Sequence, residues 1–252
     1  MDGANVSQAG APLAVKQPRE LSSAMLLALL LAVFLLAWET VSLTGLWLRD
    51  LFPSPFAVVL EAWRQIVSGT LTPHLLTSAA QVGLGLSIGG SAGLVVGTAL
   101  GVSQMLERVV EPLLHYCACV PKIIIYPISL WFLGIGMASK VAQGALASFF
   151  PIMINTAASV RAVKPIHIEA ARLLGASGLK LYTKVYLPAM AGHLLVGLRL
   201  GMGVAIISTL IAETKLAEKG IGYLTIEYFA QFRITEMYAL LLIIFTAAMV
   251  LN

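Results

Sequence analysis

Residues 165–188 read PIHIEAARLLGASGLKLYTKVYLP, and the first half of this stretch predicts a short helix with a defined stop. Pro165 suits the first turn of a helix, because its missing N–H costs nothing there. Residues 166–174 continue the helical pattern. Gly175 suits the left-handed residue that follows many helices. We therefore expect the chain to turn sharply at this glycine.

The second half of the stretch predicts another short helix. Ser177 can cap it, and we expect it to run to about Val185 and to end at Leu187-Pro188. Apolar runs flank the pair, so the pair forms a loop between two membrane spans. The loop is basic, with a single acid, Glu169, against five cations: Arg161, Lys164, Arg172, Lys180 and Lys184. By the positive-inside rule the loop faces the cytoplasm.

Outward from this loop, hydropathy predicts an all-α membrane protein with about six spans. Of the 252 residues, 59% are hydrophobic and 11% charged, and the mean hydropathy is +0.90. Soluble domains carry about 25% charged residues, so the bilayer must be the solvent of this chain. The expected spans are 21–41, 74–101, 112–133, 140–161, 192–213 and 236–252.

The N-terminus is expected on the cytoplasmic side. Residues 1–20 are polar and predict a disordered cytoplasmic tail, so 21–252 form the transmembrane domain. The first apolar run starts too late for a signal peptide and has no clear cleavage site, so we expect an uncleaved span. In this orientation the cytoplasmic segments hold eight Lys and Arg residues, and the outer segments hold six: Arg49, Arg64, Lys140, Lys215, Lys219 and Arg233.

Two outer segments are expected to form helices at the membrane surface. Residues 56–67 are amphipathic, and Ser54 with Pro55 at the first helical position predicts where this helix begins. Residues 223–232 form the second candidate. The last apolar run is short, so either it is tilted unusually or the chain continues beyond Asn252, and we expect the latter.

The second span carries a ridge of glycines spaced four apart. In lipid, small residues at this spacing let a second helix approach closely, because hydrophobic attraction between helices is absent there. We expect the ridge to pack inside the molecule, and a contact with a second copy is the alternative. Its members are Gly85, Gly89, Gly93, Gly97 and Gly101, and Gly197 and Gly201 repeat the spacing on the fifth span.

Two cations within apolar runs are candidates for a solute pathway. Lys122 lies between Pro121 and Pro127, which are expected to bend the third span. Its ammonium either lines an anion's route or reaches the headgroup region from the cytoplasmic end of the span. Arg199 lies about seven residues into the fifth span, where it either pairs with an acid or lines the inner vestibule.

Catalytic, nucleotide and metal sites are not expected. The sequence has no G-x-x-x-x-G-K-[ST] phosphate-binding loop, and no nucleophile, base and acid set. The four histidines have no paired-ligand spacing, so no metal site is predicted. The positive net charge fits the positive-inside bias and does not indicate nucleic acid. Cys117 and Cys119 cannot bridge two residues apart on a helix and are expected to be small buried packing groups.

The basic loop resembles the EAA loop of the permease subunits of bacterial ABC importers. That pattern is Glu-Ala-Ala, three residues, Gly, nine residues, an aliphatic residue, one residue, and Leu-Pro. It is matched by Glu169-Ala170-Ala171, Gly175, Val185 and Leu187-Pro188, with Val where Ile is usual. The resemblance extends over about residues 70–250. Three further segments resemble the nitrate, sulfonate and taurine branch: Pro53-Ser54-Pro55, Phe132–Gly136 with Ser139-Lys140, and Phe150-Pro151-Ile152.

The resemblance implies a type I ABC importer permease fold in the bacterial inner membrane. It also implies that residues 162–188 are the coupling loop, with contacts through Glu169, Ala170, Ala171, Gly175, Leu187 and Pro188. The implied partners are two ATP-binding subunits that hold ATP and Mg, a second permease copy in a homodimer, and a periplasmic or lipid-anchored solute-binding protein. This chain would hold no cofactor itself, and the solute would be a small anion.

Two other functions compete with this interpretation. A secondary transporter working without an ATPase predicts inverted repeats and carboxylates within the spans, and such carboxylates are nearly missing. A membrane-embedded enzyme predicts a catalytic constellation. Co-purification with an ATPase subunit would separate all three.

Overall fold

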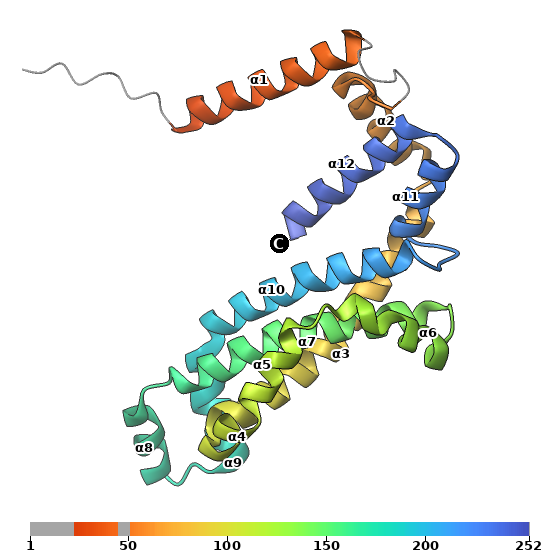
Figure 1. The fold of residues 1–252 in the computed structure, drawn as a ribbon. Helices are drawn as coiled ribbons and strands as arrows, with labels where there is room; N and C mark the ends of the chain where they lie inside the picture. The colour runs from red at the N-terminus through yellow and green to blue at the C-terminus, as the bar shows by residue number, and fades with distance from the viewer. Residues whose placement is uncertain (1–22, 45–50, 252) are drawn as a thin grey trace, which may run out of the picture.

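In a computed structural model, which describes residues 23–44 and 51–251, one long helix lies at the centre of a helical bundle. This helix, α7 (Met137–Arg161), packs between α3 (Thr72–Val102) and α10 (Leu187–Glu213) (Figure 1). Within the described ranges every regular element is a helix. The expected all-α class is confirmed.

Small residues let α3 approach α7 closely. A Cβ added at Gly89 would overlap the carbonyl oxygen of Ala145, and one at Gly97 would lie 2.5 Å from that of Met153. Where α10 meets α7, a Cβ at Gly197 would lie 2.7 Å from the Cβ of Asn155. These helices therefore meet backbone to backbone, as small residues permit in lipid. The glycine ridge of α3 faces α7 and not a second copy.

The third apolar segment is broken. Helix α5 (Glu111–Cys119) stops before Pro121, a 3-10 turn η1 follows at Lys122–Ile125, and α6 (Tyr126–Leu133) continues at 85° to α5. Proline has no N–H to donate and excludes the preceding turn, so the two prolines account for the bend. The Lys122 ammonium donates to the Ala118 carbonyl across the break.

The long apolar helices agree with the expected polytopic membrane fold. In the described part of the chain, four helical segments are long and apolar enough to cross a membrane, or five if the bent pair counts as one span. The sixth apolar run also forms a helix, α12 (Ile234–Leu251). The four segments are Ala24–Thr44, Thr72–Val102, Met137–Arg161 and Gly178–Glu213.

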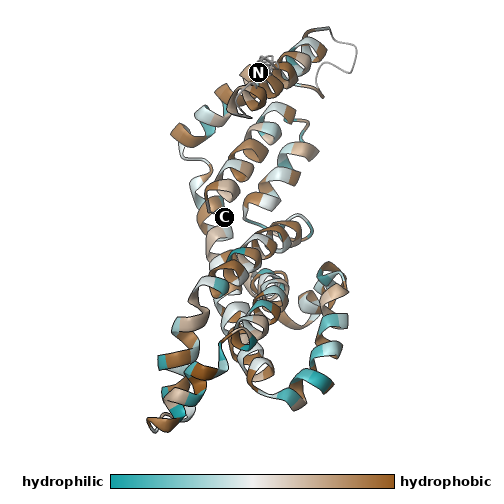
Figure 2. Ribbon diagram, turned by 90° about the vertical axis from the view of Figure 1, so that its left-hand side faces the viewer, coloured by the Kyte–Doolittle hydropathy of each residue, from teal (hydrophilic) through white to brown (hydrophobic). Residues whose placement is uncertain are grey.

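The remaining helices lie around this core. Helix α1 (Ser23–Thr44) extends away from the bundle (Figures 1 and 2). Most of its large apolar side chains are exposed. Helix α2 (Pro55–Ser68) begins as expected, with the Ser54 hydroxyl accepting from the Ala57 N–H. It packs against α12, and α11 (Ile221–Ala230) lies nearby. Helix α4 (Gln104–Val109) connects α3 to α5. The predicted tail, 1–20, lies outside the described residues.

Candidate functional site

A short helix at one end of the bundle presents the Glu-Ala-Ala sequence. Helix α8 (Pro165–Leu173) is followed by Gly175 with φ +81°. The N–H of Gly175 donates to the Arg172 carbonyl, and the N–H of Ala176 to the Ala171 carbonyl, both at 2.9 Å. This pair of bonds is the Schellman motif, which satisfies carbonyls at the helix end. The left-handed glycine thus sets the angle at which the chain leaves α8.

The segment after Gly175 differs from the expected second helix. Ser177 precedes α9 (Gly178–Leu181), but its hydroxyl makes no capping bond. The helix does not end at Leu187-Pro188, because a π-helical turn at Tyr182–Tyr186 (η2) carries it directly into α10. Pro188 cannot donate to the Lys184 carbonyl and would crowd it in a regular helix. The wider turn accommodates the ring, so the loop and the long helix form one continuous segment.

One side of α8 packs on the bundle and the other is free. Ile168 and Ala171 pack against a buried apolar cluster that includes Val160 and Met190. Glu169 and Ala170 face outward, and Leu173 and Leu174 are 90% and 88% exposed. An open groove of about 460 Å³ joins α8 to the start of α10 and is lined by His167, Ala170, Lys184, Val185, Pro188 and Ala189. The structure thereby brings Ala170 and Pro188 together, although they are 18 residues apart.

An ion-pair group holds the end of α7 that leads into α8. The Arg161 guanidinium donates to both carboxylate oxygens of Glu111, at 2.7 and 2.8 Å. Glu107 lies 3.6 Å from the same guanidinium. Forked arginine–carboxylate pairs fix orientation better than single contacts. Arg161 therefore links the end of α7, just before α8, to α4 and α5. The sequence analysis did not predict this link.

A second polar group lies at the end of the bundle opposite α8. Glu213 at the end of α10 is 1% exposed; it accepts from the Ser78 hydroxyl at 2.6 Å and from the Gly222 N–H at 2.7 Å. Lys140 is also 1% exposed, and its ammonium donates to the carbonyls of Ile135 and, at 2.5 Å, Leu216. We call Ser78, Lys140 and Glu213, with the backbone groups they bind, the Lys140–Glu213 cluster.

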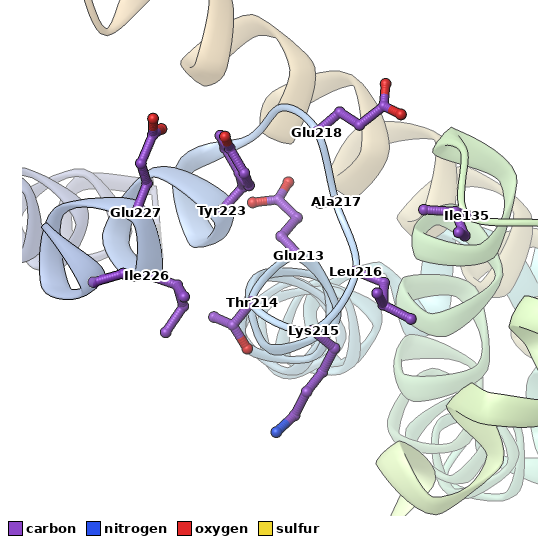
Figure 3. Close-up of a pocket in the computed structure, with 11 residues that line it drawn as sticks. Ile135, Glu213, Thr214, Lys215, Leu216, Ala217, Glu218, Tyr223, Ile226 and Glu227 are labelled. Carbon is purple, nitrogen blue, oxygen red and sulfur yellow. The ribbon is translucent and has the colours of Figure 1, made fainter.

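This cluster fastens the connections at its end of the molecule. The loop 214–220 passes over the end of α10, with Glu213 and Lys215 pointing in opposite directions (Figure 3). Next to this loop, a pocket of about 420 Å³ is lined by residues that include Leu216, Tyr223 and Glu227. From the sequence, Lys140 was interpreted as an outer flanking cation, and Glu213 was not singled out. An ionisable residue at the edge of an apolar run indicates only a span end unless its neighbours in space are known.

The other candidates of the sequence analysis lie apart from the groove at α8. The Lys122 ammonium lies 4.7 Å from the centre of the Phe150 ring on α7, a cation–π arrangement. Arg199 lies on α10 with an exposed side chain. Cys117 and Cys119 are free and exposed, so the expectation that they are buried packing groups is wrong. The helix that carries them contacts α7 along only part of its surface.

The long apolar helices and the exposed helical loop between α7 and α10 define a polytopic membrane permease. The chain belongs to the family of binding-protein-dependent transport system inner membrane components, whose model matches residues 89–252. It is the permease subunit of an ATP-driven importer and not a catalytic chain.

Relatives cover most of the chain. The putative aliphatic sulfonates transport permease protein SsuC of Bacillus subtilis is 32% identical over 199 residues, which are 79% of this chain and 72% of the relative. The taurine transport system permease protein TauC of Escherichia coli is 33% identical over 77% of this chain and 72% of its own length. The nitrate import permease protein NrtB of Synechococcus elongatus is 28% identical over 77% and 72%.

Proposed function

We propose that residues 162–188 are the coupling loop of the transmembrane domain, residues 21–252. Through this loop, ATP hydrolysis in a partner subunit drives the movement of the spans. The observation that carries this proposal is α8, with its outward face formed by Glu169, Ala170, Leu173 and Leu174. Exposed leucines at this density are costly in water and suit a docking contact. The Glu169 carboxylate offers a charge-assisted bond to a basic group of the partner. Leu187 and Pro188 transmit the motion, because η2 joins the loop directly to α10.

The assembly that we propose contains two such permease chains as a homodimer and two ATP-binding subunits that hold ATP and Mg. A periplasmic or lipid-anchored binding protein delivers the solute. The N-terminus and α8 lie on the cytoplasmic side of the inner membrane, in line with the basic residues of the loop. The Lys140–Glu213 cluster then lies at the outer end. The family description, which names dependence on a binding protein, supports the partners.

The solute that we propose is a small anion of the sulfonate, taurine or nitrate kind. The names of three relatives support this class. Lys122 and Arg199, with the bend at Pro121 and Pro127, are the proposed pathway residues, since cations within spans commonly mark solute routes. Lys122→Met should lower uptake of an anionic solute and leave assembly with the ATPase intact. Unchanged uptake would show that Lys122 has no role in the pathway and serves only to bind the Ala118 carbonyl at the break.

The central test is reconstitution. The chain, co-expressed with an ATP-binding subunit, should co-purify with it and, with a binding protein added, import taurine or nitrate into vesicles only when ATP is hydrolysed. A variant of the ATP-binding subunit that binds but does not hydrolyse ATP is the control. Import that continues with this variant would favour a secondary transporter instead.

A further inference from the structure

A pocket of about 260 Å³ that includes charged and polar side chains lies beside the Lys140–Glu213 cluster. It is enclosed by the start of α3, the turn between α6 and α7, and the loop after α10. Its charged lining consists of two ammonium groups and one carboxylate, so the lining itself carries an excess positive charge, and the Glu213 carboxylate of the neighbouring cluster lies outside it. The polar residues around it are Thr77, Gln81, Lys140, Glu218 and Lys219.

The Lys140 ammonium has capacity for a further partner. It has three N–H donors, and two of them are used on the carbonyls of Ile135 and Leu216. Among the described residues no carboxylate oxygen lies within 4 Å of it, and Glu213 acts on it only through space. A buried cation in a span without a contacting anion is a functional-site signal, and its natural partner is an anion.

Gln81 provides a second, independent sign of a ligand. Its side chain is only 3% exposed and lines the pocket, yet its Oε1 atom has no hydrogen-bond partner in the described part of the protein. Buried amide groups are nearly always bonded. A half-turn about the last torsion of this amide places its NH₂ group where Oε1 lies, so Gln81 can donate to an anion's oxygen.

Polar groups continue inward from the pocket. Gln143 follows Lys140 by three residues on α7, so both lie on one side of the helix. Both amide atoms of Gln143 and the hydroxyl of Thr209 are buried without a partner among the described residues. Unbonded polar groups are expensive within a membrane. Their concentration on this side of α7 is what a route for a polar solute requires.

We propose that this pocket binds the oxyanion group of the transported solute, a sulfonate or a nitrate, when it first enters the permease. The inference rests on the proposed function, because it assumes an anionic solute. Lys140 and Gln81 donate to the oxyanion, and Lys219 at the exposed rim attracts it. The carbonyls of Ile135 and Leu216 hold the Lys140 ammonium in place at the edge of this pocket.

Binding to the permease itself can be separated from binding to the delivery protein. The full permease–ATPase complex in lipid nanodiscs, without a binding protein, is titrated calorimetrically with ethanesulfonate and with ethyl methyl sulfone, an uncharged analogue of similar shape. We expect ethanesulfonate to bind and the sulfone not to. Gln81→Glu should lower the affinity for ethanesulfonate about tenfold, because it replaces a hydrogen-bond donor by a carboxylate. Gln81→Leu, which removes the donor without adding charge, should weaken it less.

Two exposed lysines of one loop provide a matched control. Lys219→Glu should lower the affinity for ethanesulfonate about two- to fivefold, as expected for an exposed charge. Lys215→Glu makes the same charge change four residues away, outside this pocket, and should leave affinity unchanged. Both residues are exposed, so neither variant threatens folding. Lys140→Met would also release the loops at Ile135 and Leu216 and is therefore not the deciding variant.

The outcomes separate this inference from the proposed function. If the wild-type complex binds neither probe, or binds both with equal affinity, the proposed anion site is wrong. Equal effects of Lys215→Glu and Lys219→Glu also overturn it, as does full affinity in both Gln81 variants. ATP-driven uptake of an anion in vesicles, measured alongside, tests the proposed function alone. If uptake is normal and pocket binding absent, only the pocket is wrong.

Discussion

Gly175 shows how much one backbone angle can decide. Its φ of +81° closes the Schellman motif of α8, and no other atom lies near the position that a side chain would take. A substitution here is therefore opposed by backbone strain and not by crowding. Glu169, six residues earlier, is exposed, so its carboxylate is available to a partner chain.

Gly175→Val and Glu169→Lys should each insert normally and lose coupled transport. The valine is strained by about 1–2 kcal/mol in the left-handed region and tilts α8. The lysine reverses the charge offered to the partner. Solute-stimulated ATP hydrolysis in reconstituted vesicles measures both. Gly175→Asn is the control, since asparagine tolerates this conformation and should retain most coupling. If both test variants couple ATP hydrolysis to transport as well as the wild type, residues 162–188 are not the coupling loop.

Two glycines of α3 differ only in what they face. A methyl group at Gly89 would overlap backbone of α7, whereas Gly83 has open space around it. Gly89→Ala should lower stability by about 1–3 kcal/mol, the usual cost of overpacking. Gly83→Ala should be neutral or slightly stabilising, because alanine favours helix by up to about 1 kcal/mol. Melting temperatures of the purified subunit compare them. Equal melting temperatures would contradict the close approach of α3 and α7.

Among the elements, the junction of α7 and α8 depends on partners from another segment. Arg161 lies only four residues before Pro165, the first residue of α8. An ion pair at Arg161 therefore fixes the position in space from which α8 begins. The pair is partly exposed, and exposed pairs contribute only about 0.2–1 kcal/mol to stability. Its role is therefore orientation of the loop more than stability of the bundle.

Reversing one charge of this pair should uncouple the transporter, and reversing both should restore it. Arg161→Glu places three carboxylates together with Glu107 and Glu111, so α8 should shift and transport should fall severalfold. Adding Glu111→Arg re-forms an opposite-charge pair and should recover a large part of the activity. Uptake per ATP hydrolysed is the measurement, with melting temperature as the check on folding. If the double variant is no better than Arg161→Glu, the pair does not position the loop.

For the molecule as a whole, orientation follows from where its basic residues gather. The loop that contains α8 and the loop 214–220 lie at opposite ends of the bundle (Figure 1). If α8 faces the cytoplasm, Ser68 at the end of α2 faces outward. Both Ser68 and Ser177 are exposed.

Cysteine labelling can test this orientation. Cys117 and Cys119 are exposed and must first be replaced by serine. A cysteine at position 177 should then react with an impermeant thiol reagent only from the cytoplasmic side, and one at position 68 only from outside. The serine-only protein, which should not react from either side, is the control. The opposite labelling pattern would reverse the topology.

Much of the fold followed from local patterns. Apolar runs indicated the long helices, because the bilayer selects for length and composition along a single segment. The stop of α8 at Gly175, the cap at Ser54 and the bend near Pro121 also depend on a few neighbouring residues, and each was expected before the structure. The Glu-Ala-Ala spacing likewise indicated the family from its residues alone.

The tertiary structure decided what depends on residues distant in the sequence. Lys140 and Glu213 are 73 positions apart, and only the packing of α3, α7 and α10 shows that both are buried in one cluster. The pair of Arg161 with Glu111 and the pocket beside Gln81 depend on packing in the same way. The continuous helix through Pro188 was also unexpected, because a π-helical turn has no sequence signal as plain as a proline. Local propensity acts within one or two turns, whereas the burial of a charge is set by every helix around it.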